Sequence, residues 1–301
     1  MRVFVTGASG WIGSALVPEL LAAGHHVLGL ARSQASAAAL EKAGAEPVHG
    51  SLADLGLLQE TARASDAVAH LAFRHDIAFT GDFAGAAHSD RAAVDAFGEA
   101  LAGTDKPFTI ASGLLGLAPG QVATETTWPA DEDSPGSQRA ATARATVALA
   151  DKGVRSSVVR LAPTVHGEGD LGFVPALIGF ARDKGFAGYP GDGTQRWPAV
   201  HRVDAAHLFR LALENAPAGA VLHAAAEEGI PQRDIATVIG EHLDLPVTSV
   251  APADAPAHFG WLAGSTALDA PSSATRTKTL LGWNPTGPGL LADMAAHYFT
   301  A

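Results

Sequence analysis

The sequence predicts an α/β protein in which a doubly wound parallel sheet is followed by a small C-terminal α/β lobe. Two observations predict this class. Short apolar runs rich in β-branched residues alternate with helical patterns from the N-terminus onward. The chain also has 301 residues, 47% of them hydrophobic and 17% charged. That length and composition allow a large core and fit one sheet-based unit with a smaller lobe.

The first strand and helix predict a nucleotide site. The apolar run at residues 3–5 is followed by glycines three positions apart and then by a helical pattern. Glycine at positions 7 and 10 lets a phosphate approach the backbone amides, and Gly13 lets the helix lie close to the strand. Unpaired N–H groups and the helix dipole would hold a pyrophosphate there. The alternative is a glycine-rich turn that binds nothing. The cofactor contacts predicted in this stretch are Thr6, Gly7, Ser9, Gly10, Trp11, Ile12 and Gly13.

The tip of the second predicted strand, residues 26–31, indicates which dinucleotide is bound. An acidic residue about 20 positions past the glycines would bind the ribose hydroxyls of NAD, whereas an arginine accommodates the 2′-phosphate of NADP. No Asp or Glu occurs between Glu19 and Glu41, and Arg32 and Ser33 follow the strand. Because a guanidinium pairs a phosphate bidentately, the sequence favours NADP over NAD, with Arg32 and Ser33 as contacts. The alternative for Arg32 is a solvated charge.

Two further strands, at residues 46–50 and 66–72, are expected to end beside the same site, because ligands bind beyond the carboxyl ends of parallel strands. Leu52 would cover an adenine, and Asp54 would cap the next helix. His70, inside the fourth strand, is expected to be a hydrogen-bonded core histidine. The end of that strand adds the pocket candidates Leu71, Ala72, Phe73 and His75.

A helix at residues 84–102 leads to a fifth predicted strand at residues 107–113, whose tip carries Ser112. This serine would either hold a substrate carbonyl or end the strand in a simple turn. An acidic loop then precedes an alanine-rich helix at residues 136–150 and a sixth strand at residues 154–161.

The remainder of the chain changes character and predicts a second, smaller lobe. The dinucleotide-binding domain is expected to span residues 1–165, with residues 196–226 returning to it, and the substrate lobe to comprise residues 166–195 and 227–301. The elements expected here are a loop at residues 162–170, a helix at 173–181, a turn at 189–193, a helix capped by Asp204, a seventh strand at 221–224, a helix at 232–243 and a strand at 247–250.

Composition excludes several function classes. The net charge of -11 without a Lys/Arg cluster argues against nucleic-acid and anionic-membrane partners. The absence of cysteine removes disulfides and thiolate chemistry, and none of the 13 histidines falls in a His-Glu-x-x-His pattern, so no metal site is expected. No signal peptide or apolar run of about 20 residues is visible, which predicts a cytoplasmic protein.

Five ordered segments resemble the extended short-chain dehydrogenase/reductase superfamily, which includes the NAD-dependent epimerase/dehydratases. Residues 6–13 resemble its TGxxGxxG motif, and residues 160–167 resemble its RPxxVYGPG segment with histidine in place of tyrosine. Residues 70–72, 200–205 and 281–285 match further segments in order. The resemblance covers nearly the whole chain. It implies a Rossmann-type nucleotide domain and places Pro163 near the nicotinamide.

The superfamily usually carries Tyr-x-x-x-Lys on the helix before the sixth strand, where the pair serves acid–base chemistry. Here that helix has neither residue, and Arg139 and Ala143 fall closest to the missing pair. Arg139 would either orient an anionic or carbonyl group or be a solvated charge. A histidine has a suitable pKa for proton donation near neutrality, although each is alternatively structural. The candidates for the substitute proton donor are Ser112, His75, His166, Tyr189 and His201.

Three functions follow from this resemblance. The favoured one is an NADP(H)-dependent oxidoreductase acting on a small, hydrophobic carbonyl or alcohol compound. The alternatives are an NADP-binding redox sensor or scaffold without turnover, and an isomerase, epimerase or lyase. The small residues in the helices at 84–102 and 136–150 permit a homodimer. A pocket built from five aromatic residues would be apolar, although each of them is alternatively a core residue: Phe73, Trp128, Phe173, Tyr189 and Trp197.

Overall fold

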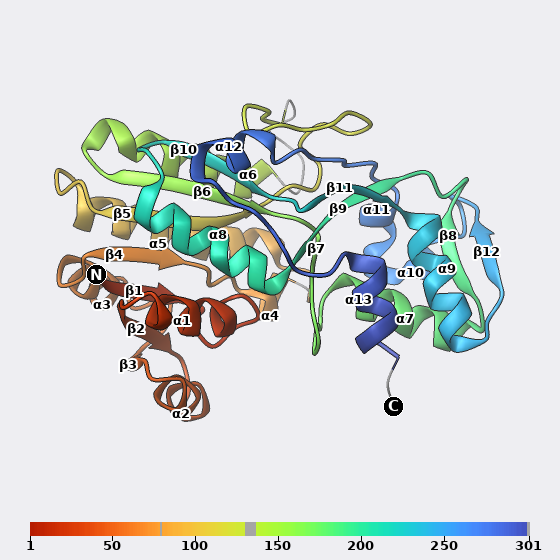
Figure 1. Cartoon of the computed structure of the whole chain (residues 1–301), viewed down its shortest axis with the longest axis horizontal. Coiled ribbons are helices and arrows are strands. Elements are labelled where there is room, and N and C mark those ends of the chain that lie inside the picture. The colour runs from red at the N-terminus through yellow and green to blue at the C-terminus, as the bar shows by residue number, and fades with distance from the viewer. Residues whose placement is uncertain (79, 130–136, 300–301) are drawn as a thin grey trace.

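The computed structural model describes residues 1–78, 80–129 and 137–299. A seven-stranded parallel sheet forms its larger part, with strand order β10-β6-β5-β4-β1-β2-β3 (Figure 1). The strands are β1 (Arg2–Thr6), β2 (His26–Ala31), β3 (Glu46–His49), β4 (Ala67–His70), β5 (Pro107–Gly113), β6 (Arg155–Leu161) and β10 (Ala220–Ala224).

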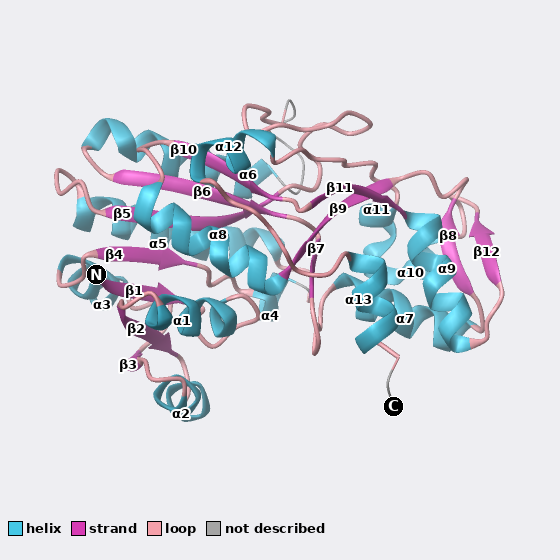
Figure 2. Ribbon diagram, viewed as in Figure 1, coloured by secondary structure: helices cyan, strands magenta, loops and turns pink. Residues whose placement is uncertain are grey.

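Helices cover both faces of this sheet, as Figure 2 shows. On one face lie α1 (Gly13–Ala22), α2 (Gln34–Lys42) and α8 (Arg202–Asn215). On the other lie α3 (Leu55–Arg63), α5 (Phe83–Leu101) and α6 (Ser137–Ala148). Because both faces are covered, the central strands read as continuous apolar runs: Val3, Phe4 and Val5 are fully buried.

The predicted fold class is therefore confirmed. The strands expected at residues 26–31 and 107–113 are observed with those bounds, and residues 221–224 join the main sheet beside β6. The helix expected at residues 136–150 is α6 followed by a 3-10 turn at Leu149–Lys152, and residue 136 lies outside the described residues. His70 is a hydrogen-bonded core histidine, as expected.

Two small sheets and a third apolar core lie beside the main sheet. One sheet has the order β11-β9-β7, and the other pairs β12 with β8 in parallel. Their strands are β7 (Thr164–His166), β8 (Ala187–Pro190), β9 (Arg196–His201), β11 (Glu227–Pro231) and β12 (Val247–Val250). The helices of this part are α7 (Phe173–Lys184), α9 (Gln232–Leu243), α10 (Ala255–Phe259), α11 (Ala263–Thr266) and α13 (Leu290–His297), with α4 (His75–Ala78) and α12 (Thr275–Leu281) elsewhere along the chain. In Figure 1, α7, α9 and α13 gather beyond the end of the main sheet, on the side of the C-terminus.

The sequence prediction was wrong about several of these short elements. Residues 162–170 were expected to be a loop but contain β7, and the first two residues of the turn expected at 189–193 belong to β8. Strands β9 and β11 were not predicted. Asp204 does not cap α8: His201 holds the cap position, and the Asp204 carboxylate accepts the backbone N–H groups of Thr286 and Gly287. The carboxylate thus satisfies two amides far along the chain, which a local capping rule does not anticipate.

A buried polar cluster ties β6 to β10 and to the loop that follows β5. Arg160 donates from Nη1 to the carbonyl of Thr127 at 2.7 Å and to Nε2 of His223 at 3.3 Å. His223 in turn donates from Nδ1 to the carbonyl of Ser273 at 2.9 Å. Nε2 of His223 therefore has to accept, so the imidazole is neutral. Burial lowers the pKa of His223 to about 4, and the charge of Arg160 adds to this shift while Glu125 opposes it.

We expect this histidine to make the protein less stable in mild acid. Between pH 6.5 and about 4 the unfolded chain binds a proton at residue 223 that the folded chain excludes, so the free energy of unfolding falls by about 2 kcal/mol on going from pH 7 to pH 5. His223→Gln keeps a donor and an acceptor but does not titrate. Urea unfolding of both proteins at pH 5, 6 and 7 should show a shallower pH dependence for the variant. Parallel pH profiles would contradict the assignment.

Candidate functional site

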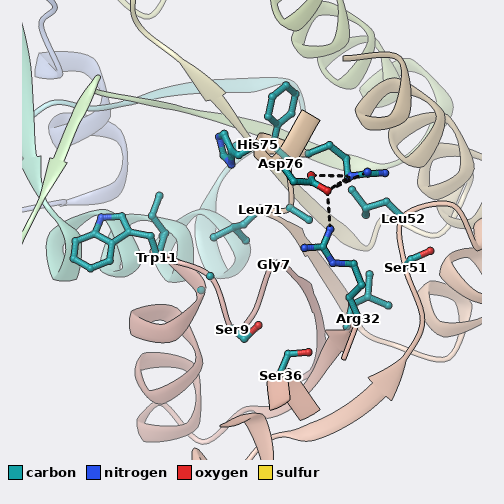
Figure 3. Close-up of a pocket in the computed structure, with 18 of the residues that line it drawn as sticks. Gly7, Ser9, Trp11, Arg32, Ser36, Ser51, Leu52, Leu71, His75 and Asp76 are labelled. Atoms are coloured by element: carbon teal, nitrogen blue, oxygen red, sulfur yellow. Dashed lines mark hydrogen bonds and ion pairs between the residues drawn. The ribbon is translucent and has the colours of Figure 1, made fainter. Parts of the chain in front are cut away.

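A cavity of about 660 Å³ lies beyond the carboxyl ends of β1, β2, β4 and β5 (Figure 3). This is the edge at which parallel α/β sheets bind ligands, and the volume lies in the range of small-molecule sites. Of the residues predicted for the site, those that line it are Gly7, Ser9, Gly10, Trp11, Ile12, Gly13, Arg32, Ser33, Leu52, Leu71, Ala72, Phe73, His75, Ser112 and Arg139.

The glycine loop between β1 and α1 can be built only from glycine at two positions. Gly7 has a φ of +68°, and a Cβ there would lie 2.8 Å from the backbone nitrogen of Ala72. A Cβ on Gly13 would lie 2.0 Å from the carbonyl oxygen of Gly7, so α1 approaches the loop as closely as backbone allows. No side chain caps the N-terminus of α1. The cavity therefore meets an uncapped helix end, whose N–H groups and dipole favour an anion.

A polar end of the cavity forms where β2 gives way to α2. The Arg32 side chain is 66% exposed and contacts Asp76 at 3.3 Å through Nη1. Ser33 caps α2, and its hydroxyl accepts the backbone N–H of Ser36. Figure 3 shows Arg32, Ser36 and Ser51 around this end, with Asp76 facing Arg32. A guanidinium and several hydroxyls thus surround one part of the cavity.

Thr6, a predicted cofactor contact, is fully buried and supports the loop from below. Its hydroxyl lies 2.7 Å from Nδ1 of His70 and also accepts the backbone N–H of Ala72 at 3.3 Å. Nε2 of His70 lies 3.1 Å from the Asp90 carboxylate. This chain of contacts fixes the ends of β1 and β4 relative to each other, so Thr6 shapes the floor of the cavity.

Another part of the cavity lining comprises Ser112, Phe73, His75 and Arg139. The guanidinium carbon of Arg139 lies 4.2 Å from the centre of the Phe73 ring, and the His75 ring lies 5.2 Å from the same ring at a steep angle. Burial lowers the pKa of His75, and the charge of Arg139 lowers it further while Asp76 opposes. An imidazole, a hydroxyl and a guanidinium therefore line one small region.

Besides Thr6, four further predicted site residues lie outside the lining of this cavity. His166 is buried on the opposite face of β7 from Val165, which does line the cavity, because neighbouring strand residues face opposite ways. Its Nδ1 lies 2.7 Å from the Asp293 carboxylate. His201 holds the N-cap of α8, Tyr189 packs in the third core under Arg233, and Pro163 falls between the lining residues Leu161 and Val165.

For the five aromatic residues named for an apolar pocket, the core alternative holds for all but Phe73. Trp197 is fully buried, and Phe173 packs against it. Trp128 lies between the guanidinium groups of Arg160 and Arg144. Only Phe73 of the five lines the cavity.

Several residues of the cavity were not predicted. Ser36 and Ser51 add hydroxyls at the polar end, and the Arg74 side chain donates to Asp76, which also faces Arg32. Only their position in the sequence could have indicated them. Arg74 and Asp76 follow shortly after the fourth strand, where ligand contacts are common. Asp54 accepts the N–H and hydroxyl of Ser51 rather than capping α3, and this lowers its pKa.

Metal-binding clusters and membrane-spanning helices are both absent from the part of the chain that the structure describes. Across residues 1–78, 80–129 and 137–299, no three His, Cys, Asp or Glu side chains are grouped so that they could hold a metal ion. Among the helices of the same ranges, none combines the length and the apolar character that crossing a membrane requires.

The fold and the glycine-lined cavity define a dinucleotide-binding α/β protein of the Rossmann type. The chain belongs to the NAD dependent epimerase/dehydratase family, whose model matches residues 3–225. An uncharacterized protein of Schizosaccharomyces pombe is 45% identical over 300 residues, covering 99% of this chain and 100% of that one. An uncharacterized protein of Saccharomyces cerevisiae is 46% identical over 300 residues, covering 99% of each chain.

Solved structures share the fold at low sequence identity. A dTDP-glucose 4,6-dehydratase from Streptomyces venezuelae, whose structure contains NAD, has a TM-score of 0.77 at 22% identity and covers 98% of this chain and 95% of its own. A UDP-glucuronic acid 4-epimerase from Bacillus cereus, whose structure also contains NAD, has a TM-score of 0.76 at 18% identity. The match covers 99% of this chain and 98% of the epimerase chain. Both structures are therefore similar to this chain in fold.

Proposed function

We propose that this protein is an NADP(H)-dependent oxidoreductase that reduces or oxidises a small carbonyl or alcohol compound. The observation that carries the proposal is a single cavity joining an uncapped, glycine-lined helix end to a region with Ser112 and His75. The first part fits a pyrophosphate, and the second offers polar hydrogens for a carbonyl oxygen. When bound, the nicotinamide would supply the hydride.

The choice of NADP rests on the polar end of the cavity. Arg32 stands at the tip of β2 with an exposed guanidinium, and Ser33, Ser36 and Ser51 surround it. This set fits a phosphate monoester, because a guanidinium pairs bidentately with phosphate oxygens and the Ser33 hydroxyl can donate a further hydrogen bond. The hydroxyls of Ser36 and Ser51 already donate to the Ser33 carbonyl and the Asp54 carboxylate. No Asp or Glu follows β2 before Glu41 to receive ribose hydroxyls. Two solved structures of similar fold contain NAD, so the affinities of this protein for NADP(H) and NAD(H) have to be measured side by side.

The chemistry at the other end would fall to His75 and Ser112. Ser112, at the tip of β5, is 7% exposed and would hold the carbonyl oxygen of a substrate. His75 would give a proton to that oxygen in reduction and take it back in oxidation. Helix α6 holds neither Tyr nor Lys between Ser137 and Ala148, so the proton has to come from another group.

The test follows nicotinamide absorbance while NADPH is mixed with a panel of ketones, aldehydes, enones and imines. Oxidation of NADPH by at least one compound supports the proposal. Tight coenzyme binding with no oxidation across the panel would favour the sensor or scaffold alternative. Conversion of a compound with no change in nicotinamide absorbance would instead favour an isomerase, epimerase or lyase. Two proteins of similar fold are named as a dehydratase and an epimerase.

We expect His75→Gln to lower the turnover of the best panel compound about a hundredfold, because a positioned acid contributes on the order of 10² or more. Burial lowers the pKa of His75 below its usual 6.5. The rate of reduction by the unaltered protein should therefore rise as the pH falls through this lowered pKa, below 6.5, since the protonated imidazole is the donor. The variant should lose this rise. His49→Gln, at an exposed position outside the cavity, is the matched control. An unchanged pH profile in His75→Gln would assign the proton to another residue.

The predicted homodimer through α5 and α6 is a further part of the proposal. It rests on the small residues of both helices, and sedimentation of the purified protein would test it.

A further inference from the structure

Arg139 lines the cavity and is a cation for which the described part of the chain, residues 1–78, 80–129 and 137–299, holds no ion-pair partner. It is half-buried on α6, and its Nη2 donates to the backbone carbonyl of Ala111 at 2.8 Å. The ring of Phe73 covers its guanidinium carbon at 4.2 Å. These contacts hold the side chain in place, but neither neutralises its charge.

The other arginines of the cavity differ in this respect. Arg32 and Arg74 both contact the carboxylate of Asp76. Within the described residues, no Asp or Glu lies at ion-pair distance from Arg139. Asp90 acts on it through space, but the carboxylate of Asp90 is already bonded to His70. Burial lowers the pKa of Arg139, yet a guanidinium keeps its proton at neutral pH. A partly desolvated, unpaired cation favours any anion that reaches it.

We propose that the cavity takes an organic carboxylate with an apolar body, and that Arg139 pairs with the carboxylate. The inference rests on the proposed function in placing the substrate at this end. The walls there are apolar, with Phe73, Leu161 and Val165 in the lining. The uncapped helix and the hydroxyls that suit phosphates lie toward α1 and α2, whereas Arg139 is a single planar fork that matches one carboxylate.

The experiment compares three 2-oxo acids, pyruvate, benzoylformate and phenylpyruvate, with their methyl esters. Each is titrated into the protein by calorimetry in the presence of NADP⁺. Because ketone and coenzyme are then both oxidised, no hydride transfer occurs and binding alone is measured. At least one acid should bind tenfold or more tightly than its ester. Equal affinity of acid and ester across the three pairs would overturn the proposal.

Two variants assign the preference to Arg139. Arg139→Met should lower the affinity for the preferred acid at least tenfold and leave its ester unchanged, and Arg139→Lys should keep part of the preference. Arg144→Met is the matched control, because Arg144 is exposed on the same helix and does not line the cavity. Unfolding temperatures of all variants check that the fold is retained, and the uncharged Arg139→Gln carries the test if Arg139→Met unfolds. An undiminished acid preference in the uncharged variant would contradict the assignment.

The same titrations separate this inference from the proposed function. If Arg139→Met weakens the binding of NADP⁺ and not that of the acid, Arg139 serves the coenzyme and the inference is wrong. If NADP⁺ does not bind but the acid is still preferred over its ester without it, the proposed function fails and the carboxylate site stands.

Discussion

Gly13→Ala is expected to lower the affinity for NADPH at least a hundredfold, about 3 kcal/mol of binding free energy. A Cβ at this position would lie 2.0 Å from the carbonyl oxygen of Gly7 and 2.7 Å from Cα of Ala8. Both neighbours are backbone, so α1 has to move away from the loop and the amides at its N-terminus lose their arrangement. Fluorescence titration with NADPH measures the loss, and thermal unfolding measures the accompanying destabilisation.

Alanine variants of two other glycines serve as controls for Gly13→Ala. A Cβ on Gly10 would lie 3.1 Å from the Gly7 carbonyl, a milder conflict, so Gly10→Ala should weaken binding less and keep the fold. Gly56, within α3, has open space around it, and alanine there should leave NADPH affinity unchanged while raising stability slightly. Undiminished NADPH binding in Gly13→Ala would show that the helix end is not the phosphate site.

Arg32→Ala is expected to lower the affinity for NADPH at least tenfold and to leave that for NADH nearly unchanged. The Arg32 side chain at the tip of β2 is 66% exposed and lines the cavity, where only the coenzyme with the extra phosphate would need its charge. Parallel titrations with both coenzymes give the ratio directly. Arg63→Ala, an exposed arginine outside the cavity lining, controls for the loss of one positive charge.

Asp76→Asn should act in the opposite direction. Its carboxylate contacts Arg32 at 3.3 Å and would compete with a phosphate for the same guanidinium. Removing the charge should therefore strengthen NADPH binding and leave NADH binding unaffected. If Arg32→Ala lowers both affinities equally, Arg32 does not read the 2′-phosphate.

The central sheet could be predicted because its strands are short, continuous apolar runs placed between amphipathic helices. The pattern at residues 26–31 and 107–113 is produced by burial on both faces. The short strands β7, β9 and β11 could not be predicted from the sequence, because each of them pairs with residues far away along the chain. His166 pairs with His201 across the β7–β9 ladder, and Pro198 interrupts the apolar pattern of β9. Local propensity carries no information about such partners.

The candidate site likewise contains residues that the sequence predicts correctly and residues that it does not. Residues directly after strands, such as Arg32, Phe73 and Ser112, line the cavity because topology alone brings those ends together. For the other candidate residues, the direction of the side chain determines whether the residue reaches the cavity. His166 faces Asp293 because β7 is a strand and Val165 takes the cavity face. Arg139 reaches the carbonyl of Ala111 through a long side chain, and its path depends on packing that sequence spacing does not encode.

The most direct measurement is titration of the purified, folded protein with NADPH and NADH at one ionic strength. NADPH is expected to bind at least tenfold more tightly than NADH, because the uncapped end of α1 would hold the pyrophosphate and Arg32 the 2′-phosphate. Equal affinities would contradict the role of Arg32. No measurable binding of either coenzyme would contradict the whole account of the cavity.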